Sequence, residues 1–278
     1  MRIFYVSRDV APAYMRIALI GFGGLGGIVA GHLARDRELT FVAIAARAHQ
    51  RERIHAMLGQ IPVVQSPAAL LELEPELVIE CASHQAFREY AEPILAAGTP
   101  LLAVSIGVLA EPELRERVLA AARKSRASLQ IPAGAIGAID AIAAARHAGL
   151  ASVAYVTRKN ARTWAGTPAE KMIDLASVRE PTLFFDDNAE RAALIFTEKA
   201  NVTATLALAG LGFRETRVRF WVDPGVNKSV HRIEAEGACG TLTLDMGNNV
   251  AAPDNKASLQ TAMSIVQAVR NRTAALRF

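Results

Sequence analysis

The stretch RIALIGFGGLGGIVAGHL, residues 16–33, decides the fold. It begins as an apolar strand, turns at a cluster of glycines and continues as an apolar helix. The spacing of Gly21, Gly23 and Gly26 fits the dinucleotide fingerprint, in which glycines allow a tight turn, a close approach of the backbone to pyrophosphate and close packing of the helix on the strand. It predicts a nucleotide phosphate at the helix N-terminus, where unpaired N–H groups and the helix dipole favour an anion. A purely structural turn is the alternative.

The composition is that of an ordinary globular protein. The chain has 278 residues, of which 51% are hydrophobic and 21% charged, so it can bury one large core or form two domains. No apolar run approaches the roughly 20 residues of a membrane span, and residues 1–14 are too polar for a signal peptide. We expect a cytoplasmic protein with no membrane partner, in which residues 1–14 are an extension ahead of the fold.

Charge and cysteine content narrow the possible partners. The net charge of +4 favours anionic ligands such as dinucleotides and dicarboxylates. The basic residues are scattered rather than clustered, so nucleic-acid binding is not indicated. The two cysteines, Cys81 and Cys239, are too few for a disulfide scaffold or a zinc site. We expect both to be small core residues.

Strands and helices alternate through the first half of the chain. Apolar runs at 39–46, 77–83 and 101–105 are typical of parallel strands that are buried on both faces. The alternation predicts an α/β fold with a Rossmann-type, doubly wound parallel sheet whose ligand lies at the carboxyl ends of the strands. Ala82 and Ser83 lie at such an end, and we expect them to contact the cofactor.

The choice between NAD and NADP depends on the end of the strand predicted over 39–46, which is followed by Arg47. In an NAD-specific site, an Asp or Glu about 20 residues beyond the glycines binds the ribose 2′-hydroxyl, whereas an Arg accommodates a 2′-phosphate. The acidic residue is missing here. Arg47 therefore predicts a preference for NADP or tolerance of it, and a solvated residue at the strand end is the alternative.

The pattern changes after the segment IPAGAIG, residues 131–137, which we interpret as the domain crossing. Beyond it, as in 217–223 and 241–246, apolar and polar residues alternate along the strands. This period of two predicts a second α+β domain with an open, mainly antiparallel sheet that helices cover on one side. The expected helices span roughly 138–148, 170–177 and 189–209.

These patterns divide the chain into three parts. An open sheet with a half-apolar outer face favours a homodimer, so the second domain is expected to serve both catalysis and dimerisation. The last helix is expected from Lys256 to about residue 272 and to return to the first domain. The predicted parts are an N-terminal extension (1–14), a dinucleotide-binding domain (15–132, joined by the C-terminal helix 256–278) and a substrate, catalytic and dimerisation domain (133–255).

Polar residues in apolar surroundings are the candidates for chemistry. His231 lies on a predicted strand and shares a face with Ile233 and Ala235. Histidine is well suited to proton transfer near neutral pH, and a structural role is the alternative. Asn201 lies within a helix of mostly apolar neighbours although Asn is a mediocre helix former, so we expect either an inward hydrogen bond or an exposed helix face. The basic loop that ends at Trp164 either meets a substrate carboxylate or is solvated.

Together these motifs identify a family resemblance. From residue 15 to residue 278 the chain resembles the L-aspartate dehydrogenases. By this resemblance, His231 matches the active-site histidine of that family, and Ala135 and Asn201 match its contacts to the nicotinamide dinucleotide outside the glycine loop. The family carries no metal. The resemblance rests on GFGGLG (21–26), IPAGAIG (131–137), TRK (157–159) with Trp164, KANV (199–202) and DPGVNKSVH (223–231).

The resemblance implies a reaction and a set of ligands. The reaction is the reversible, NAD- or NADP-dependent oxidative deamination of L-aspartate to iminoaspartate, which hydrolyses to oxaloacetate and ammonia or feeds NAD biosynthesis. Lys159, Asn227 and Lys228 are candidates to bind the substrate carboxylates. A related two-domain dehydrogenase or reductase acting on another small dicarboxylate or semialdehyde, or a non-enzymatic NAD(P)-binding regulator, is the alternative. The glycine loop that would hold the cofactor consists of Gly21, Phe22, Gly23, Gly24, Leu25 and Gly26.

Overall fold

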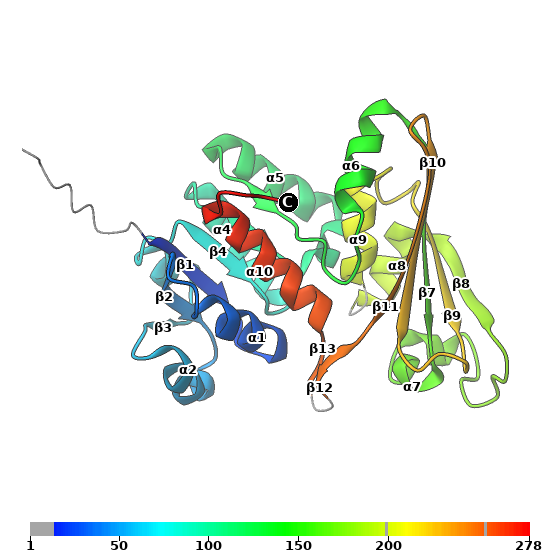
Figure 1. Cartoon of the computed structure of the whole chain (residues 1–278), viewed down its shortest axis with the longest axis horizontal. Helices are drawn as coiled ribbons and strands as arrows, with labels where there is room; N and C mark the ends of the chain where they lie inside the picture. Colours follow the sequence, from blue (N-terminus) through cyan, green and yellow to red (C-terminus); the bar gives the residue numbers. More distant parts are fainter. Residues whose placement is uncertain (1–13, 198–199, 253–254) are drawn as a thin grey trace, which may run out of the picture.

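The structure, a computed structural model, describes residues 14–197, 200–252 and 255–278, without the side chains of 250–252, 255 and 256. In this range the chain forms two neighbouring units, each of them a β-sheet with helices packed on it (Figure 1). The extension expected over residues 1–14 lies outside the described residues except for Tyr14, which is exposed. No helix in the described ranges is long and apolar enough to cross a membrane.

The first sheet has six strands in the order β3-β2-β1-β4-β5-β6, and every neighbouring pair is parallel. The chain runs outward from β1 in both directions, so the switch point lies between β1 and β4, where such folds bind their ligand. This is the Rossmann-type sheet predicted from the sequence. Its strands are β1 (Met15–Ile20), β2 (Leu39–Ala45), β3 (Val63–Val64), β4 (Leu77–Glu80), β5 (Leu101–Ala103) and β6 (Leu129–Gln130).

Both faces of this sheet are buried, which explains why its strands are apolar almost throughout. In β1, Ile17 and Leu19 belong to one hydrophobic cluster, whereas Ala18 and Ile20 belong to the other. The elements that follow its strands are α1 (Gly24–Leu33), η1 (Ala48–Gln50), α2 (Arg51–Leu58), α3 (Pro67–Leu71), α4 (His84–Ala96), η2 (Ile106–Ala110) and α5 (Pro112–Ser125), where η1 and η2 are short 3-10 helices.

The second sheet has five strands in the order β11-β10-β7-β9-β8. Only β7 and β9 run parallel, and the other pairs are antiparallel, as the alternating pattern predicts. Three helices, α6, α8 and α9, lie on its inner face, toward the first unit (Figure 1). These elements are α6 (Ile139–Ala148), β7 (Leu150–Lys159), β8 (Thr182–Asn188), α8 (Ala189–Ile195), α9 (Ala200–Ala209), β9 (Arg217–Val222), β10 (Ser229–Gly237) and β11 (Gly240–Asn248).

The C-terminal helix α10 (Leu259–Thr273) returns to the first unit and packs beside α1, as predicted (Figure 1). Its buried residues Ala262, Ile265 and Val269 join the cluster that contains Ile17 and Leu19. The helix begins later than expected because residues 255–258 form β13, which pairs with β12 (Val250–Ala252). The side chain of Ser258 then caps the helix by accepting from the N–H of Thr261.

Several local predictions were wrong. The helix expected over 170–177 is only the 3-10 turn η3 (Pro168–Lys171), and the one expected over 189–209 is broken, since α8 ends at Ile195 and α9 begins at Ala200. The segment ending at Trp164 is the short helix α7 (Ala161–Trp164) and not a loop. Its residues Arg162 and Thr163 are exposed, as the solvated alternative predicts, whereas Trp164 is fully buried. Cys239 is exposed, because it lies in the two-residue turn between β10 and β11 and not on the buried face of a strand.

Candidate active site

The glycine loop between β1 and α1 has the shape that a pyrophosphate needs. Gly21 has φ +89°, and a Cβ on it would lie 2.6 Å from the Cβ of Ala82. A Cβ on Gly26 would lie 2.1 Å from the carbonyl oxygen of Gly21. At Gly23 a Cβ would meet no atom within 4 Å. Two of the glycines are therefore required by packing, and the third leaves open space beside the helix N-terminus, which fits a nucleotide phosphate.

Side chains from η1 and α2 hold this loop in place. Arg53 donates to the carbonyl oxygen of Phe22 at 2.6 Å, and Gln50 donates to the same oxygen at 3.0 Å. The guanidinium of Arg53 also lies 5.0 Å from the centroid of the Phe22 ring. Arg47 is exposed just beyond β2, the strand end at which the ribose is expected. Sequence reasoning missed Arg53 and Gln50, since nothing local signals their contact with Phe22.

A buried carboxylate ties together the ends of β4 and β5. Glu80 is only 1% exposed, and it accepts from the N–H groups of Ala82 at 2.7 Å and Ser83 at 3.1 Å. It also accepts from the N–H of Ser105 at 2.9 Å and from the Ser105 hydroxyl at 2.8 Å. Burial raises the pKa of Glu80, and these hydrogen bonds oppose the rise. Glu80 was not predicted, although an acidic residue inside an apolar strand is a visible signal.

Asn201 connects the second unit to the first. Its Oδ1 accepts from the N–H of Gly107 at 2.9 Å and lies 2.9 Å from Nε2 of His84. The inward hydrogen bond predicted for Asn201 is therefore confirmed. Gly107 follows β5 and His84 opens α4, so both partners lie at the carboxyl edge of the first sheet. A Cβ on Gly107 would lie 2.6 Å from the Cβ of Ala200, which shows how closely α9 approaches this edge.

The loop at 133–137 joins the two units near the second sheet. The carbonyl oxygen of Ala135 accepts from Nδ2 of Asn248 at 2.5 Å, and the N–H of Gly134 donates to Ser264 of α10 at 3.0 Å. A Cβ on Gly137 would lie 3.5 Å from the sulfur of Met246, which is the cross-strand neighbour of His231. The loop that carries Ala135 therefore packs against the strand that pairs with the strand of His231.

His231 lies on the inner face of the second sheet, together with Ile233 and Ala235 as predicted, and it is 6% exposed. Its Nδ1 is 2.6 Å from the hydroxyl oxygen of Tyr155 on β7. Burial lowers the pKa of His231 to about 3, and the charge of Lys159 adds to this effect. Burial also raises the pKa of the Tyr155 hydroxyl. The imidazole is therefore neutral at neutral pH.

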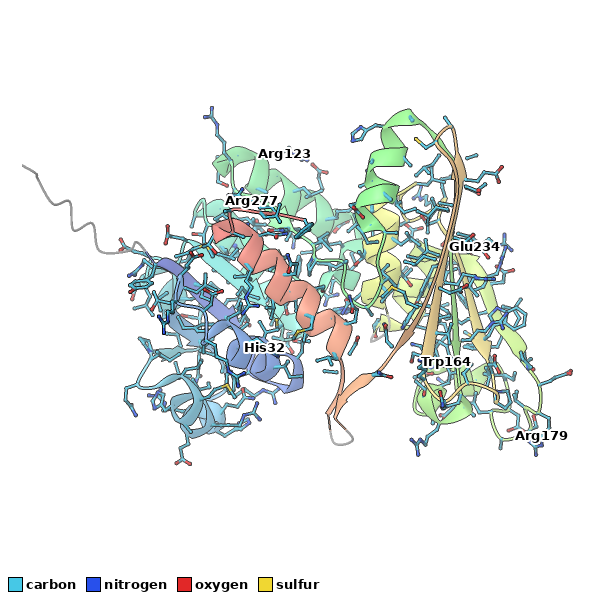
Figure 2. All side chains as sticks on the ribbon, viewed as in Figure 1. His32, Arg123, Trp164, Arg179, Glu234 and Arg277 are labelled. Carbon is cyan, nitrogen blue, oxygen red and sulfur yellow. The ribbon has the colours of Figure 1, made fainter. Side chains whose placement is uncertain are left out.

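The three predicted substrate residues lie in different environments. Lys159 ends β7, is 8% exposed, and holds its Nζ 5.0 Å from the centroid of the Trp164 ring. Figure 2 shows Trp164, the last residue of α7, at one end of the second sheet. Asn227 and Lys228 are exposed in the connection between β9 and β10, and the Lys228 stem lies against Gly247. The structure therefore brings Lys159 close to His231 and leaves the other two at the surface.

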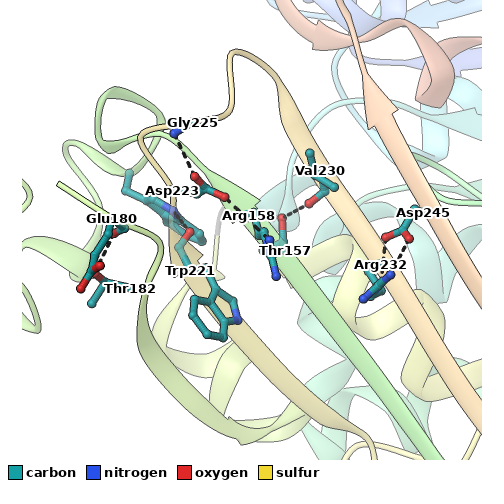
Figure 3. Close-up of polar contacts among 11 residues, drawn as sticks. Thr157, Arg158, Glu180, Thr182, Trp221, Asp223, Gly225, Val230, Arg232 and Asp245 are labelled. Atoms are coloured by element: carbon teal, nitrogen blue, oxygen red, sulfur yellow. Dashed lines mark hydrogen bonds and ion pairs between the residues drawn. The ribbon is translucent and has the colours of Figure 1, made fainter. Parts of the chain in front are cut away.

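The outer face of the second sheet carries charged pairs instead. Arg232 donates twice to Asp245, at 2.9 and 2.7 Å, and Arg158 lies 3.9 Å from the carboxylate of Asp223 (Figure 3). A surface depression of about 470 Å³ lies between α4, α5 and α8, and it is lined by none of the candidate site residues. Among the described residues, no cluster of His, Cys, Asp and Glu could hold a metal ion.

Comparison with known proteins gives matches along the whole fold. Residues 140–272 match the family model "Aspartate dehydrogenase, C-terminal", and residues 21–132 match "Homoserine dehydrogenase, NAD binding domain". The chain is 41% identical to an L-aspartate dehydrogenase of Ralstonia nicotianae over 94% of this chain and 99% of that relative. It is 39% identical to one of Pseudomonas aeruginosa, with the same coverage. A crystal structure of aspartate dehydrogenase from Thermotoga maritima, 23% identical, superimposes with a TM-score of 0.75 over 95% of this chain and 99% of that one.

Proposed function

The chain belongs to the L-aspartate dehydrogenase family, and on that premise we propose that it catalyses the reversible, NAD(P)-dependent oxidative deamination of L-aspartate to iminoaspartate, which hydrolyses to oxaloacetate and ammonia. One observation carries this proposal: 41% identity to an L-aspartate dehydrogenase that extends over 94% of the chain. The matched region spans both units, so the similarity is not limited to the nucleotide-binding sheet.

The cofactor, NAD or NADP, is assigned to the carboxyl edge of the first sheet. When bound, it supplies the acceptor for the hydride that leaves the substrate. The open space at Gly23 accommodates its pyrophosphate, and Arg47 lies where a 2′-phosphate is expected. Through its four hydrogen bonds, Glu80 fixes the positions of the chain segments that follow β4 and β5. The residues proposed to contact the cofactor are Gly21, Phe22, Gly23, Gly24, Leu25, Gly26, Arg47, Ala82, Ser83, Ala135 and Asn201.

The substrate is assigned to the inner face of the second sheet, opposite this edge. The ammonium of Lys159 is close enough to lower the pKa of His231, and it is suited to bind a substrate carboxylate. The neutral His231 is assigned to the reacting end of the substrate, beside the amine or the water that exchanges with it. Holding both reactants in one geometry accounts for much of the expected rate enhancement. Asn227 and Lys228 remain weaker candidates for the second carboxylate because both are exposed.

An amino-acid panel tests the proposed reaction. NADH or NADPH formation is followed at saturating cofactor with L-aspartate, D-aspartate, L-glutamate and L-homoserine. We expect turnover with L-aspartate alone. Comparable activity with one of the other compounds would favour the alternative of a related two-domain dehydrogenase, and binding of cofactor without turnover of any compound would favour a non-enzymatic regulator.

We also propose that the enzyme works in the cytoplasm as a homodimer whose iminoaspartate feeds NAD biosynthesis. Its two cysteines are free, as is typical of a reducing compartment. The dimer is supported by the outer face of the second sheet, which no described helix covers (Figure 1). There, Trp221 and Val156 lie among paired charges such as Arg219 with Glu234, a pattern that a second copy of the same face can complement. Light scattering of the purified chain measures the oligomeric state.

A further inference from the structure

We propose that Tyr155 is a positioning residue that holds His231 in the tautomer with its proton on Nε2, so that the histidine presents an N–H donor to an oxygen of the substrate. This inference rests on the proposed function for the identity of the substrate, but the tautomer itself can be measured without any substrate. The role proposed for Tyr155 is to donate a hydrogen bond, and Tyr155 transfers no proton to His231.

The contact between the two side chains is short and buried. The hydroxyl oxygen of Tyr155 and Nδ1 of His231 are 2.6 Å apart, and the two residues are 2% and 6% exposed. One proton must lie between these atoms, because two acceptors without a proton, or two donors facing each other, would repel at this distance. Burial disfavours both the phenolate of Tyr155 and the imidazolium of His231, so both groups stay neutral. If Nδ1 carried the shared proton, the buried Tyr155 O–H would need a second acceptor, whereas an unprotonated Nδ1 is itself an acceptor at 2.6 Å. We therefore assign the proton to the tyrosine oxygen, with Nδ1 as its acceptor.

The tautomer follows from this assignment. A neutral imidazole carries one N–H, and when Nδ1 is an acceptor that N–H is on Nε2. Among the residues that the structure describes, Nε2 of His231 has no hydrogen-bond partner. Thr157 is the cross-strand neighbour of His231, but its hydroxyl donates to the carbonyl of Val230 at 2.9 Å (Figure 3). The Nε2–H group is therefore available to a ligand.

The fold holds the hydrogen bond between Tyr155 and His231 in place. Tyr155 lies within β7, beside β10, and its ring packs edge to face on Phe220 with centroids 6.3 Å apart. The Tyr155 and His231 rings are nearly parallel, at 12°, with centroids 5.9 Å apart. Because both side chains come from neighbouring strands of one sheet, their hydroxyl-to-nitrogen contact is preformed before any substrate binds.

A fixed N–H donor has a specific use in this reaction. When ammonia adds to the keto group of oxaloacetate, negative charge develops on the former carbonyl oxygen. A donor that already points at this oxygen stabilises the charge without reorganisation. The same transition state is crossed in the deaminating direction, so the donor accelerates the reaction in both directions. In this tautomer Nε2 cannot act as a base, which assigns the removal of protons to another group or to water.

Nuclear magnetic resonance tests the tautomer directly. The chain has six histidines, so protein labelled with ¹⁵N-histidine gives few signals, and His231→Asn identifies the one of interest. We expect His231 in the wild type to show a protonated Nε2 and an unprotonated Nδ1. In Tyr155→Phe we expect this preference to be lost and both tautomers to be populated. Tyr90→Phe is the matched control, because it removes a hydroxyl from a buried tyrosine of α4, and it should leave the His231 signals unchanged.

Three substitutions then test the donor role in turnover with L-aspartate. A Gln amide reaches about as far as Nε2, whereas an Asn amide reaches about as far as Nδ1. We expect His231→Gln to keep at least tenfold more turnover than His231→Asn, and Tyr155→Phe to lose about tenfold in kcat with unchanged cofactor affinity. A wild-type His231 protonated on Nδ1, or an unchanged tautomer in Tyr155→Phe, would overturn the proposal. Equal loss in the Gln and Asn variants would overturn its donor role. A correct tautomer in a protein that does not oxidise aspartate would refute only the proposed function.

Discussion

Two glycines in the same loop, Gly23 and Gly26, should respond in opposite ways to the addition of one methyl group. In Gly26→Ala the new Cβ would lie 2.1 Å from the carbonyl oxygen of Gly21, well inside any tolerated contact. The helix and the strand must separate locally, and overpacking of this kind costs about 1–3 kcal/mol of unfolding free energy. For a chain of this length, that lowers the melting temperature by roughly 2–12 °C, at about 2–4 °C per kcal/mol.

Gly23→Ala adds its methyl group to open space, since no atom lies within 4 Å of the new Cβ. The backbone there has φ −75° and ψ −158°, a conformation that alanine adopts without strain. The unfolding free energy should therefore change by less than about 1 kcal/mol. The methyl group occupies the space assigned to the pyrophosphate, so the cofactor affinity should fall at least about tenfold, which corresponds to about 1.4 kcal/mol of binding free energy.

Thermal unfolding and titration with NADH and NADPH, followed by fluorescence on the same preparations, distinguish the two variants. The expected pattern is a stable Gly23→Ala protein that binds cofactor poorly and a destabilised Gly26→Ala protein. If Gly23→Ala binds both cofactors as tightly as the wild type does, the pyrophosphate does not approach Gly23 and the assignment of the loop is wrong.

The other predictions concern charge. Arg47→Asp should weaken the affinity for NADP much more than that for NAD, and equal losses would show that Arg47 does not touch the 2′-phosphate. Glu80→Gln replaces one oxygen acceptor with an N–H donor, so it should lower the unfolding free energy by about 1–3 kcal/mol and raise the KM for cofactor; unchanged values would contradict its role. Because the folded-state pKa of His231, about 3, lies below its unfolded value of about 6.5, the unfolded chain binds more protons between these pH values, and stability falls as the pH is lowered. His231→Gln should remove up to about 1.4 kcal/mol per pH unit of this dependence in chemical denaturation, and an identical pH dependence would contradict the burial of a neutral histidine.

Patterns of apolar and polar residues along the sequence were enough to predict the strands of the first sheet and the face of the strand that carries His231. The first sheet was predictable because each of its strands is apolar enough to be buried on both faces, and β1 runs directly into Gly21 and Gly23. The face of His231 was predictable because side chains alternate along a strand, which puts Ile233 and Ala235 beside it.

The partners of the site residues could not be predicted in the same way. Tyr155 and His231 are 76 positions apart, and their contact depends on the register of β7 against β10. The bond between Asn201 and His84 depends on the packing of α9 against the first unit, across 117 positions. Glu80 is different, because a carboxylate within a buried strand already indicates a compensating set of donors.

The break between α8 and α9 also has a physical reason. The helical pattern continues through Phe196, but Phe196 packs into an aromatic cluster with Trp164 and Phe220 and leaves the helical conformation with ψ +57°. Tertiary packing therefore overrides the local preference for a single long helix. The new start at Ala200 brings Asn201 into the first turn of α9, where it meets Gly107.

The most direct test of the central claim is His231→Asn, with turnover of L-aspartate, cofactor affinity and melting temperature measured on one preparation. If His231 contacts the reacting centre of an aspartate dehydrogenase, the variant should bind NADH or NADPH with nearly unchanged affinity and melt near the wild-type temperature, yet lose at least about 100-fold in turnover, the usual scale for removing a catalytic proton donor or acceptor. A variant that is destabilised but turns over L-aspartate at close to the wild-type rate would show that His231 is a structural residue and would contradict the account.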